Sequence, residues 1–193
     1  MNKVQRINKV WNEIEAFLNT DRGRPGWLNA TANPGATDFE IGILKSEFDF
    51  ELPADFVASW RRHNGCLPDK ILFAFRLLPI KDIIAYYHDG IRNNRTKEAD
   101  LDGEAPFSFD EGGYCKDVIQ IGETICFWNL ILHLRTGRVY LSQSGTSPSL
   151  LGESFVDYLE GIESNLKNEK FEHSFGGNIE GFFLMEEWGI RLR

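Results

Sequence analysis

Apolar residues recur every three or four positions near the start of the chain. They are Val4, Ile7, Val10, Trp11, Ile14, Phe17 and Leu18. This spacing places them on one face of a helix, with the charged positions on the other face. The pattern therefore predicts an amphipathic helix over 4–18. The next stretch, 19–37, is rich in glycine and proline and predicts turns, because neither residue sustains regular structure.

Two further helices are predicted before residue 66. Thr37 and Glu40 are spaced as a capping box, which indicates a helix from Asp38 to about Phe48. Pro53 can open the next helix, because the first turn does not need the missing amide hydrogen. Asn64-Gly65 should stop this helix, since both residues tolerate a left-handed backbone. Its inward face is formed by Phe56, Val57 and Trp60.

The rest of the chain alternates between strand and helix patterns. Strands are predicted at 70–80, 118–123, 124–134 and 138–144, and helices at 81–91 and within 147–168. The last three strands form an antiparallel meander, with a hairpin turn at Arg135-Thr136-Gly137. Residues 92–117 remain unassigned, and 180–193 fit either a strand or a short helix. Together these elements predict one α+β domain over 1–193, in which N-terminal and C-terminal helices flank a twisted, mostly antiparallel sheet.

The composition is that of a folded acidic protein. Of 193 residues, 42% are hydrophobic, and the formal net charge is −8. A negative surface repels phosphate, so nucleic acids and anionic membranes are poor partners, whereas a basic protein is an easy one. The acidic residues form two groups, and each group is interpreted first as solvated surface. They are Asp38, Glu40, Glu47, Asp49, Glu51 and Asp55, and Asp100, Asp102, Glu104, Asp110 and Glu111.

Three cysteines, Cys66, Cys115 and Cys126, show no paired CxxC spacing. An odd number of unpaired thiols fits a reducing compartment, so a cytoplasmic location is expected. The N-terminus has no apolar segment typical of a signal peptide, and no run approaches the length that spans a membrane.

His63 is the most conspicuous candidate for catalysis. It could act as a general base, but the neighbouring sequence supplies neither a nucleophile nor an orienting partner. The alternative, which we favour, is that His63 only ends a helix. The four histidines also lack zinc spacing, and common nucleotide-binding and hydrolase motifs are absent. We therefore expect no catalytic residues, no metal and no cofactor.

The second acidic group resembles a calcium loop in part. Asp100, Asp102, Glu104, Ser108 and Glu111 fall at positions one, three, five, nine and twelve of such a loop. However, Ala105 stands where the loop requires glycine, and Pro106 interrupts it. An exposed acidic loop is the preferred interpretation.

The order of these elements resembles the SUKH superfamily, which includes the yeast cell-wall-assembly regulators. The resemblance covers about 10–166, leaving 169–193 as an extension, and its most specific part is a series of three short motifs. They are Leu52-Pro53, His63-Asn64-Gly65 and Leu77-Leu78-Pro79-Ile80. The resemblance implies an α+β fold and a non-enzymatic protein that binds other proteins.

Bacterial members of this superfamily are commonly immunity proteins that neutralise toxins, so the resemblance implies a toxin as the partner. The negative charge suggests a basic toxin domain. The expected contacts are the acidic residues of the loop, Asp100, Asp102, Glu104, Asp110 and Glu111. Two alternatives remain open. One is a regulatory or scaffold protein without a toxin, and the other is a hydrolase that uses His63.

Overall fold

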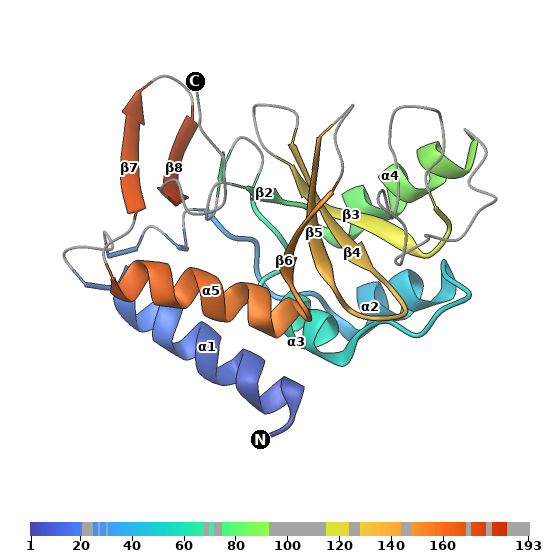
Figure 1. The fold of residues 1–193 in the computed structure, drawn as a ribbon, viewed down its shortest axis with the longest axis horizontal. Coiled ribbons are helices and arrows are strands. Elements are labelled where there is room, and N and C mark those ends of the chain that lie inside the picture. The colour runs from blue at the N-terminus through green and yellow to red at the C-terminus, as the bar shows by residue number, and fades with distance from the viewer. Residues whose placement is uncertain are drawn as a thin grey trace.

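The helices and strands follow one another in an order that separates most helices from the central strands. The computed structural model describes residues 1–20, 25–26, 28–29, 31–67, 70–71, 75–92, 115–123, 128–143, 148–168, 171–176 and 179–184. The helices are α1 (Lys3–Leu18), α2 (Asp38–Ser46), α3 (Ala54–Arg62), α4 (Ile80–Arg92) and α5 (Phe155–Lys167). Within these residues, the five helices and a five-stranded antiparallel sheet form an α+β arrangement, which confirms the predicted fold class (Figure 1).

The five-stranded sheet contains the predicted meander. Its order is β2-β3-β4-β5-β6, and each neighbouring pair is antiparallel. The strands are β2 (Arg76–Leu77), β3 (Val118–Glu123), β4 (Trp128–His133), β5 (Val139–Gln143) and β6 (Ser149–Gly152). The hairpin between β4 and β5 closes through the Gly137 amide, which donates to the His133 carbonyl at 2.8 Å, and Gly137 has a φ of 77°. This positive φ suits glycine because no Cβ opposes it. The hairpin prediction is confirmed.

A second, three-stranded sheet uses the end of the chain. Its order is β1-β8-β7, with β1 (Lys70–Ile71) parallel to β8 (Ile179–Leu184) and β8 antiparallel to β7 (Phe171–Gly176). Of the two structures that 180–193 could adopt, the described part is a strand.

The prediction of one continuous strand over 70–80 is wrong. The segment contributes β1 to one sheet and β2 to the other, and α4 begins at Ile80. An alternating pattern indicates which side chains are buried. It does not indicate whether the whole segment pairs with a single partner strand. Here β1 pairs with β8 and β2 pairs with β3.

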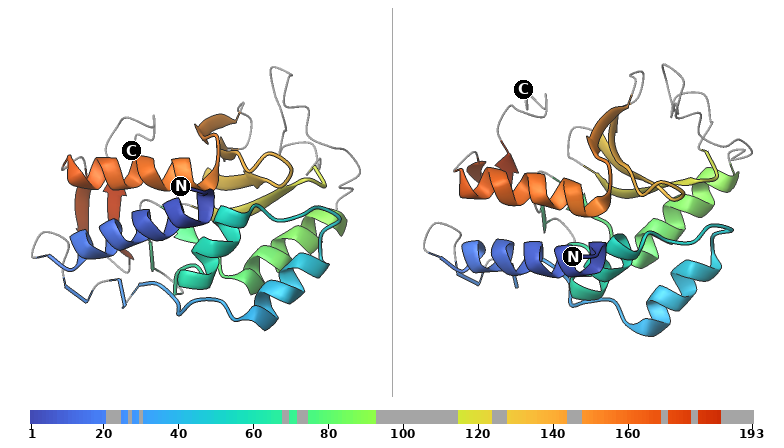
Figure 2. Two further views of the ribbon diagram at one scale, coloured as in Figure 1. Left: turned by 90° about the horizontal axis from the view of Figure 1, so that it is seen from below. Right: turned by 60° about the horizontal axis from the view of Figure 1, so that its bottom comes forward.

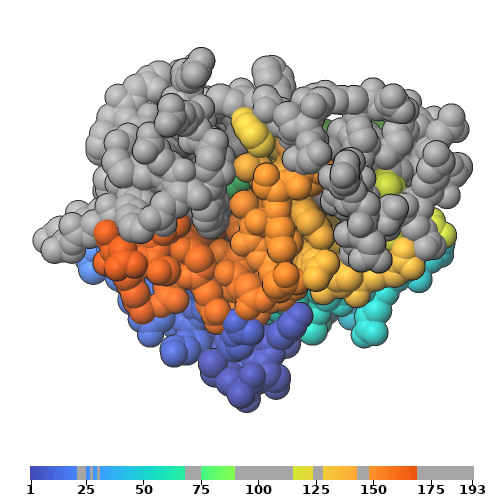
Figure 3. Space-filling view, viewed as in Figure 1, coloured from blue at the N-terminus to red at the C-terminus, as the bar shows by residue number. Residues whose placement is uncertain are grey.

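The first and last long helices lie side by side and run in the same direction (Figure 2). Arg6 near the start of α1 bonds Asp157 and Glu160 near the start of α5, each at 2.6 Å. At the other end, Lys167 of α5 lies 3.4 Å from Glu13 of α1. In the space-filling view the surface of α1 directly borders that of α5 (Figure 3). The predicted N-terminal helix is confirmed, and its apolar face packs against elements distant in sequence.

Helix α3 lies against both of these helices through a buried aromatic cluster. The Trp60 ring centroid is 4.2 Å from that of Phe56 and 5.3 Å from that of Phe155 in α5. On the α1 side, the Trp11 indole nitrogen donates to the Ser59 hydroxyl at 2.9 Å. Aromatic pairs in this geometry add stability beyond their buried area, and the indole N–H is satisfied. The pattern of inward residues predicted for α3 is confirmed.

One member of the first acidic group is not on the surface. Asp55 is fully buried, and its carboxylate Oδ2 accepts a hydrogen bond from the Val156 amide at 3.1 Å. Val156 lies in the first turn of α5, where free amides and the helix dipole favour a negative charge. The interpretation of this group as solvated surface is therefore wrong for Asp55, which joins the starts of α3 and α5.

Candidate functional site

The residues predicted to contact a partner lie outside the part of the chain that the structure describes. Asp100, Asp102, Glu104, Asp110 and Glu111 all fall within 93–114. The acidic-loop contact therefore stays a prediction.

His63 occupies the end of α3, as its place before Asn64-Gly65 predicted. It is the residue that follows the last helical turn, and its amide donates to the Ser59 carbonyl at 3.0 Å. The ring lies edge-on to Trp11, with centroids 4.8 Å apart. Its Nε2 is 2.9 Å from a carboxylate oxygen of Glu15 on α1. The imidazole thus joins α3 to α1.

The Glu15 carboxylate also holds the neighbouring arginine. Arg62 Nε and Arg62 Nη2 bind its two oxygens at 2.5 and 2.6 Å. Burial alone would raise the pKa of Glu15, but the hydrogen bonds from Arg62 and His63 outweigh burial and lower it. The contacts described for His63 include no Ser, Thr or Cys side chain that it could activate. His63 and Arg62 together bind Glu15 and hold the end of α3 against α1.

Asn64 connects three helices through its side chain and main chain. Its Oδ1 accepts from the Ile80 amide at 2.9 Å, at the first residue of α4. Its Nδ2 donates to Glu40 in the first turn of α2 at 3.2 Å, and its own amide donates to the Pro34 carbonyl at 3.2 Å. Asn64 therefore fixes the ends of α2, α3 and α4 relative to one another.

Gly65 is required by its surroundings as well as by its backbone angle. Its φ is 68°, and a Cβ there would stand 2.5 Å from the Leu78 carbonyl carbon and from the Pro79 nitrogen. The next amide, that of Cys66, donates to the Leu77 carbonyl at 2.7 Å. Two of the motifs that carry the family resemblance, His63-Asn64-Gly65 and Leu77-Leu78-Pro79-Ile80, thus meet in space.

A cavity of about 420 Å³ opens beside this junction. Its lining includes Glu40, Asn64, Arg76, Lys81 and Asp82. Hydrogen bonds from the Thr37 amide and hydroxyl, and from Asn64, lower the pKa of Glu40. The carboxylates and cations of the lining are mixed rather than sorted by charge.

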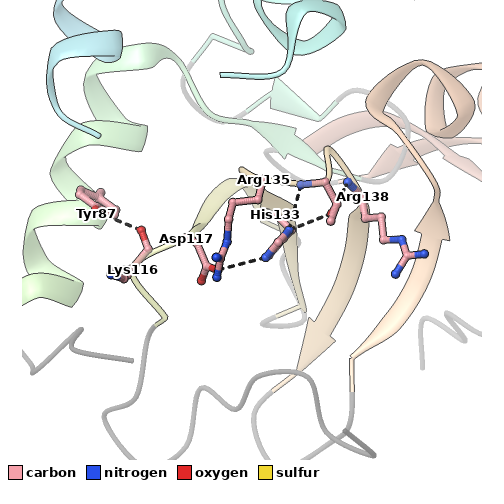
Figure 4. A network of polar contacts seen from close by, with 7 residues as sticks. Tyr87, Lys116, Asp117, His133, Arg135 and Arg138 are labelled. Atoms are coloured by element: carbon pink, nitrogen blue, oxygen red, sulfur yellow. Dashed lines mark hydrogen bonds and ion pairs between the residues drawn. The ribbon is translucent and has the colours of Figure 1, made fainter. Parts of the chain in front are cut away.

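A polar cluster that includes the buried Asp117 and His133 lies at the hairpin of β4 and β5 (Figure 4). The fully buried Asp117 accepts from Arg135 at 2.7 Å, and His133 Nε2 lies 3.2 Å from the same oxygen. The Thr136 amide donates to His133 Nδ1 at 3.2 Å, so the ring proton sits on Nε2 and points toward Asp117. Burial lowers the pKa of His133 despite the neighbouring carboxylate. The cluster holds the hairpin and the start of β3 together.

Neither a metal site nor a membrane span emerges from the described residues. Among them, no group of three or more His, Cys, Asp or Glu side chains could hold a metal ion. None of the helices in that part of the chain is both long and apolar enough to cross a bilayer.

The sequence patterns did not single out Phe39. Among the described residues it is the one aromatic in the set of large, exposed apolar side chains. Phe39 in the first turn of α2 is 77% exposed, and Ile43 one turn later is 37% exposed. Ile41 and Leu44 form the buried side of the same helix. The available signal was that Phe39 and Ile43 fall outside this apolar face of α2.

Comparison with known proteins identifies the fold family. The model of the SMI1/KNR4 family (SUKH-1) matches residues 35–161, which run from the turn before α2 into α5. A search of curated proteins gave no match. The family match covers the junction of α2, α3 and α4 and the whole central sheet. The chain belongs to the SMI1/KNR4 family (SUKH-1).

Proposed function

We propose that this chain is an immunity-type protein, which binds a cognate toxin domain and neutralises it by covering its active surface. Membership of the SMI1/KNR4 family (SUKH-1) carries the proposal. Members of the SUKH superfamily act by binding other proteins and are often immunity proteins. On this proposal the chain needs no catalytic residue, because inhibition requires only tight association.

The charge of the chain supports a basic toxin domain as the partner. The formal net charge is −8, and the described surface carries exposed carboxylates such as Asp38, Asp49 and Glu51. Many enzymes that cut nucleic acid are basic where they bind phosphate. An acidic inhibitor approaches such a surface under long-range attraction and associates quickly.

The acidic loop of 100–111 belongs to the same proposal. Asp100, Asp102, Glu104, Asp110 and Glu111 place five carboxylates within twelve residues. We expect charge reversal of Asp100, Asp102 and Asp110 to Lys to weaken protection, because the reversed loop would repel a basic partner. Unchanged protection by this triple variant would remove the loop from the interface.

Co-expression tests the function directly. The chain is produced in cells together with the toxin domain encoded beside its own gene, and growth is compared with that of cells making the toxin alone. Rescue of growth, together with a stable complex of the two purified proteins, is the expected result. A complex without rescue would instead favour a regulatory or scaffold protein.

The variant His63→Ala distinguishes inhibition by binding from hydrolysis. If the chain acts by binding, a folded His63→Ala protein still protects, because His63 contacts Glu15 and Trp11 within the chain. Loss of protection by a protein that retains its fold and its affinity for the toxin would point to a reaction that uses this histidine.

A further inference from the structure

One face of α2 presents apolar side chains to solvent. Phe39 and Ile43 are one turn apart, so their side chains lie next to each other on the helix. Gly42 lies between them in sequence, and a Cβ built there would meet nothing within 4 Å. We call these three residues the α2 outer face. Figure 2 shows α2 at the edge of the helical layer, beside α3 and α4.

Helix α2 is well packed on its other side, so the α2 outer face is not exposed because the helix is loose. Ile41 and Leu44 are 2% and 0% exposed, so the opposite side of α2 is already anchored in the core. The N-terminus of the helix is closed by the reciprocal hydrogen bonds of Thr37 and Glu40. Phe39 therefore contributes nothing to either anchorage. A large aromatic side chain that stands exposed on a helix surface is the kind of residue that anchors protein interfaces.

The chain segment that contains the α2 outer face has a net negative charge. Segment 37–51 contains five carboxylates, against one lysine. Asp38, next to Phe39, has a side chain that is 89% exposed and pairs with the half-exposed Arg61 at 2.8 Å. A surface pair of this kind contributes little to stability, so both groups can exchange for contacts with a partner.

We propose that the α2 outer face is the apolar centre of the toxin-binding surface, with Phe39 inserted into an apolar socket that is ringed by basic residues. The inference rests on the proposed function and specifies where the toxin binds. A positive rim on the partner would meet the exposed Asp38 next to Phe39, and the socket would remove Phe39 from water. A second copy of the chain is a poor partner for this face, because it would bring the same acidic segment and a further net charge of −8.

The chain offers matched control positions elsewhere. Leu150 on β6 is 46% exposed, and Glu153 pairs with Arg138 at 2.7 Å much as Asp38 pairs with Arg61. The test variants are Phe39→Ser and Asp38→Lys, and the controls are Leu150→Ser and Glu153→Lys. Since all four side chains are exposed, each variant should keep the melting temperature of the parent chain within a few degrees.

The test uses the purified toxin domain that is encoded beside the gene of this chain. Its association and dissociation rates are measured by surface plasmon resonance at low and high salt. We expect Phe39→Ser to weaken binding at least tenfold, mainly through faster dissociation. We expect Asp38→Lys to slow association and to reduce its dependence on salt. Leu150→Ser and Glu153→Lys should stay within about twofold of the parent chain.

The outcomes separate this inference from the proposed function. If the parent chain binds the toxin domain and Phe39→Ser binds equally well, the α2 outer face is not the centre of the interface, while the proposed function stands. If the parent chain does not bind the toxin domain, the proposed function and this inference both fail. A parent chain that dimerises in sedimentation, and becomes monomeric on Phe39→Ser, would assign the face to a second copy and overturn the inference.

Discussion

Gly65 and Pro79 approach so closely that a Cβ on Gly65 would stand 2.5 Å from the Pro79 nitrogen. The left-handed φ of 68° adds a second cost for any other residue. We therefore expect Gly65→Ala to lower the free energy of unfolding by about 3 kcal/mol or more, since a backbone must move to relieve the contact. Urea unfolding measures the change.

Gly42→Ala is the matched control for Gly65→Ala. Gly42 lies within α2, and nothing stands within 4 Å of its missing Cβ. Alanine there should raise the free energy of unfolding by about 0.5–1 kcal/mol, because it reduces the entropy of the unfolded chain. If alanine changed the free energy of unfolding equally at both glycines, the junction of Gly65 with Pro79 would not be tightly packed.

Asn64→Asp should destabilise the fold at neutral pH and much less in acid. The new carboxylate would keep the acceptor for the Ile80 amide, but would face the Glu40 carboxylate at the position where Asn64 now donates. At neutral pH the repulsion should cost about 1–2 kcal/mol. It should fade as the pH drops toward about 4, because the repulsion raises the pKa of the facing carboxyls and one of them is protonated first.

Asn64→Ala provides the comparison, because it removes both bonds at every pH. We expect a loss of about 2 kcal/mol that changes little with pH, since the Ile80 amide is left without its partner. The measurement is the urea midpoint of both variants between pH 3.5 and 7.5. Parallel pH profiles for the two variants would show that Asn64 does not lie against Glu40.

Asp117→Asn should destabilise the β4–β5 hairpin. The buried carboxylate accepts from Arg135 and faces His133, and the amide would offer neither charge nor the same acceptor strength. We expect a loss of about 2–4 kcal/mol in the free energy of unfolding. The double variant Asp117→Asn with Arg135→Gln should lose less stability than the sum of the losses of the two single variants, by at least about 1 kcal/mol. Simple additivity would contradict the contact.

Stability should fall in acid in two stages. Burial lowers the pKa of His133 below its ordinary value of 6.5, so the unfolded chain binds that proton more readily and stability declines as the pH falls below about 6.5. The lowered pKa values of Glu15 and Asp157 mean that both carboxylates stabilise the fold above their ordinary pKa values. That contribution is lost as the pH falls through the folded values, below about 4.

Urea unfolding of the parent chain and of His133→Gln between pH 3 and 8 separates the two stages. The variant should lose the decline that begins below about pH 6.5 and keep the steeper one below about pH 4. If His133→Gln shows the same profile as the parent chain over the whole range, His133 does not contribute to the pH dependence.

Local patterns predicted the helices well, because the signals lie within each helix. The Thr37 and Glu40 capping box is present as expected, with the Thr37 amide donating to Glu40 at 2.8 Å. The start of α3 after Pro53 and the β4–β5 turn were equally local. Such features depend on residues fewer than five positions apart.

Partnerships across the chain could not be read in the same way. The carboxylate that holds His63 belongs to Glu15, 48 residues earlier, and Asp55 binds an amide 101 residues later. An aspartate in an acidic stretch looks solvated until the opposing helix is known. The exposure of Phe39 likewise depends on what the other elements leave uncovered. These properties arise from the tertiary arrangement, and local periodicity does not encode them.

The pairing of α1 with α5 sets when the domain can be completed during synthesis. Arg6 leaves the ribosome 151 residues before its partner Asp157. At roughly 5–20 residues per second, the part of α1 that packs against α5 waits for about 8–30 s before that helix exists. A nascent chain halted before α5 therefore leaves that part of α1 open to chaperones and proteases, and synthesis of α5 is the point at which the contact between the two helices can form.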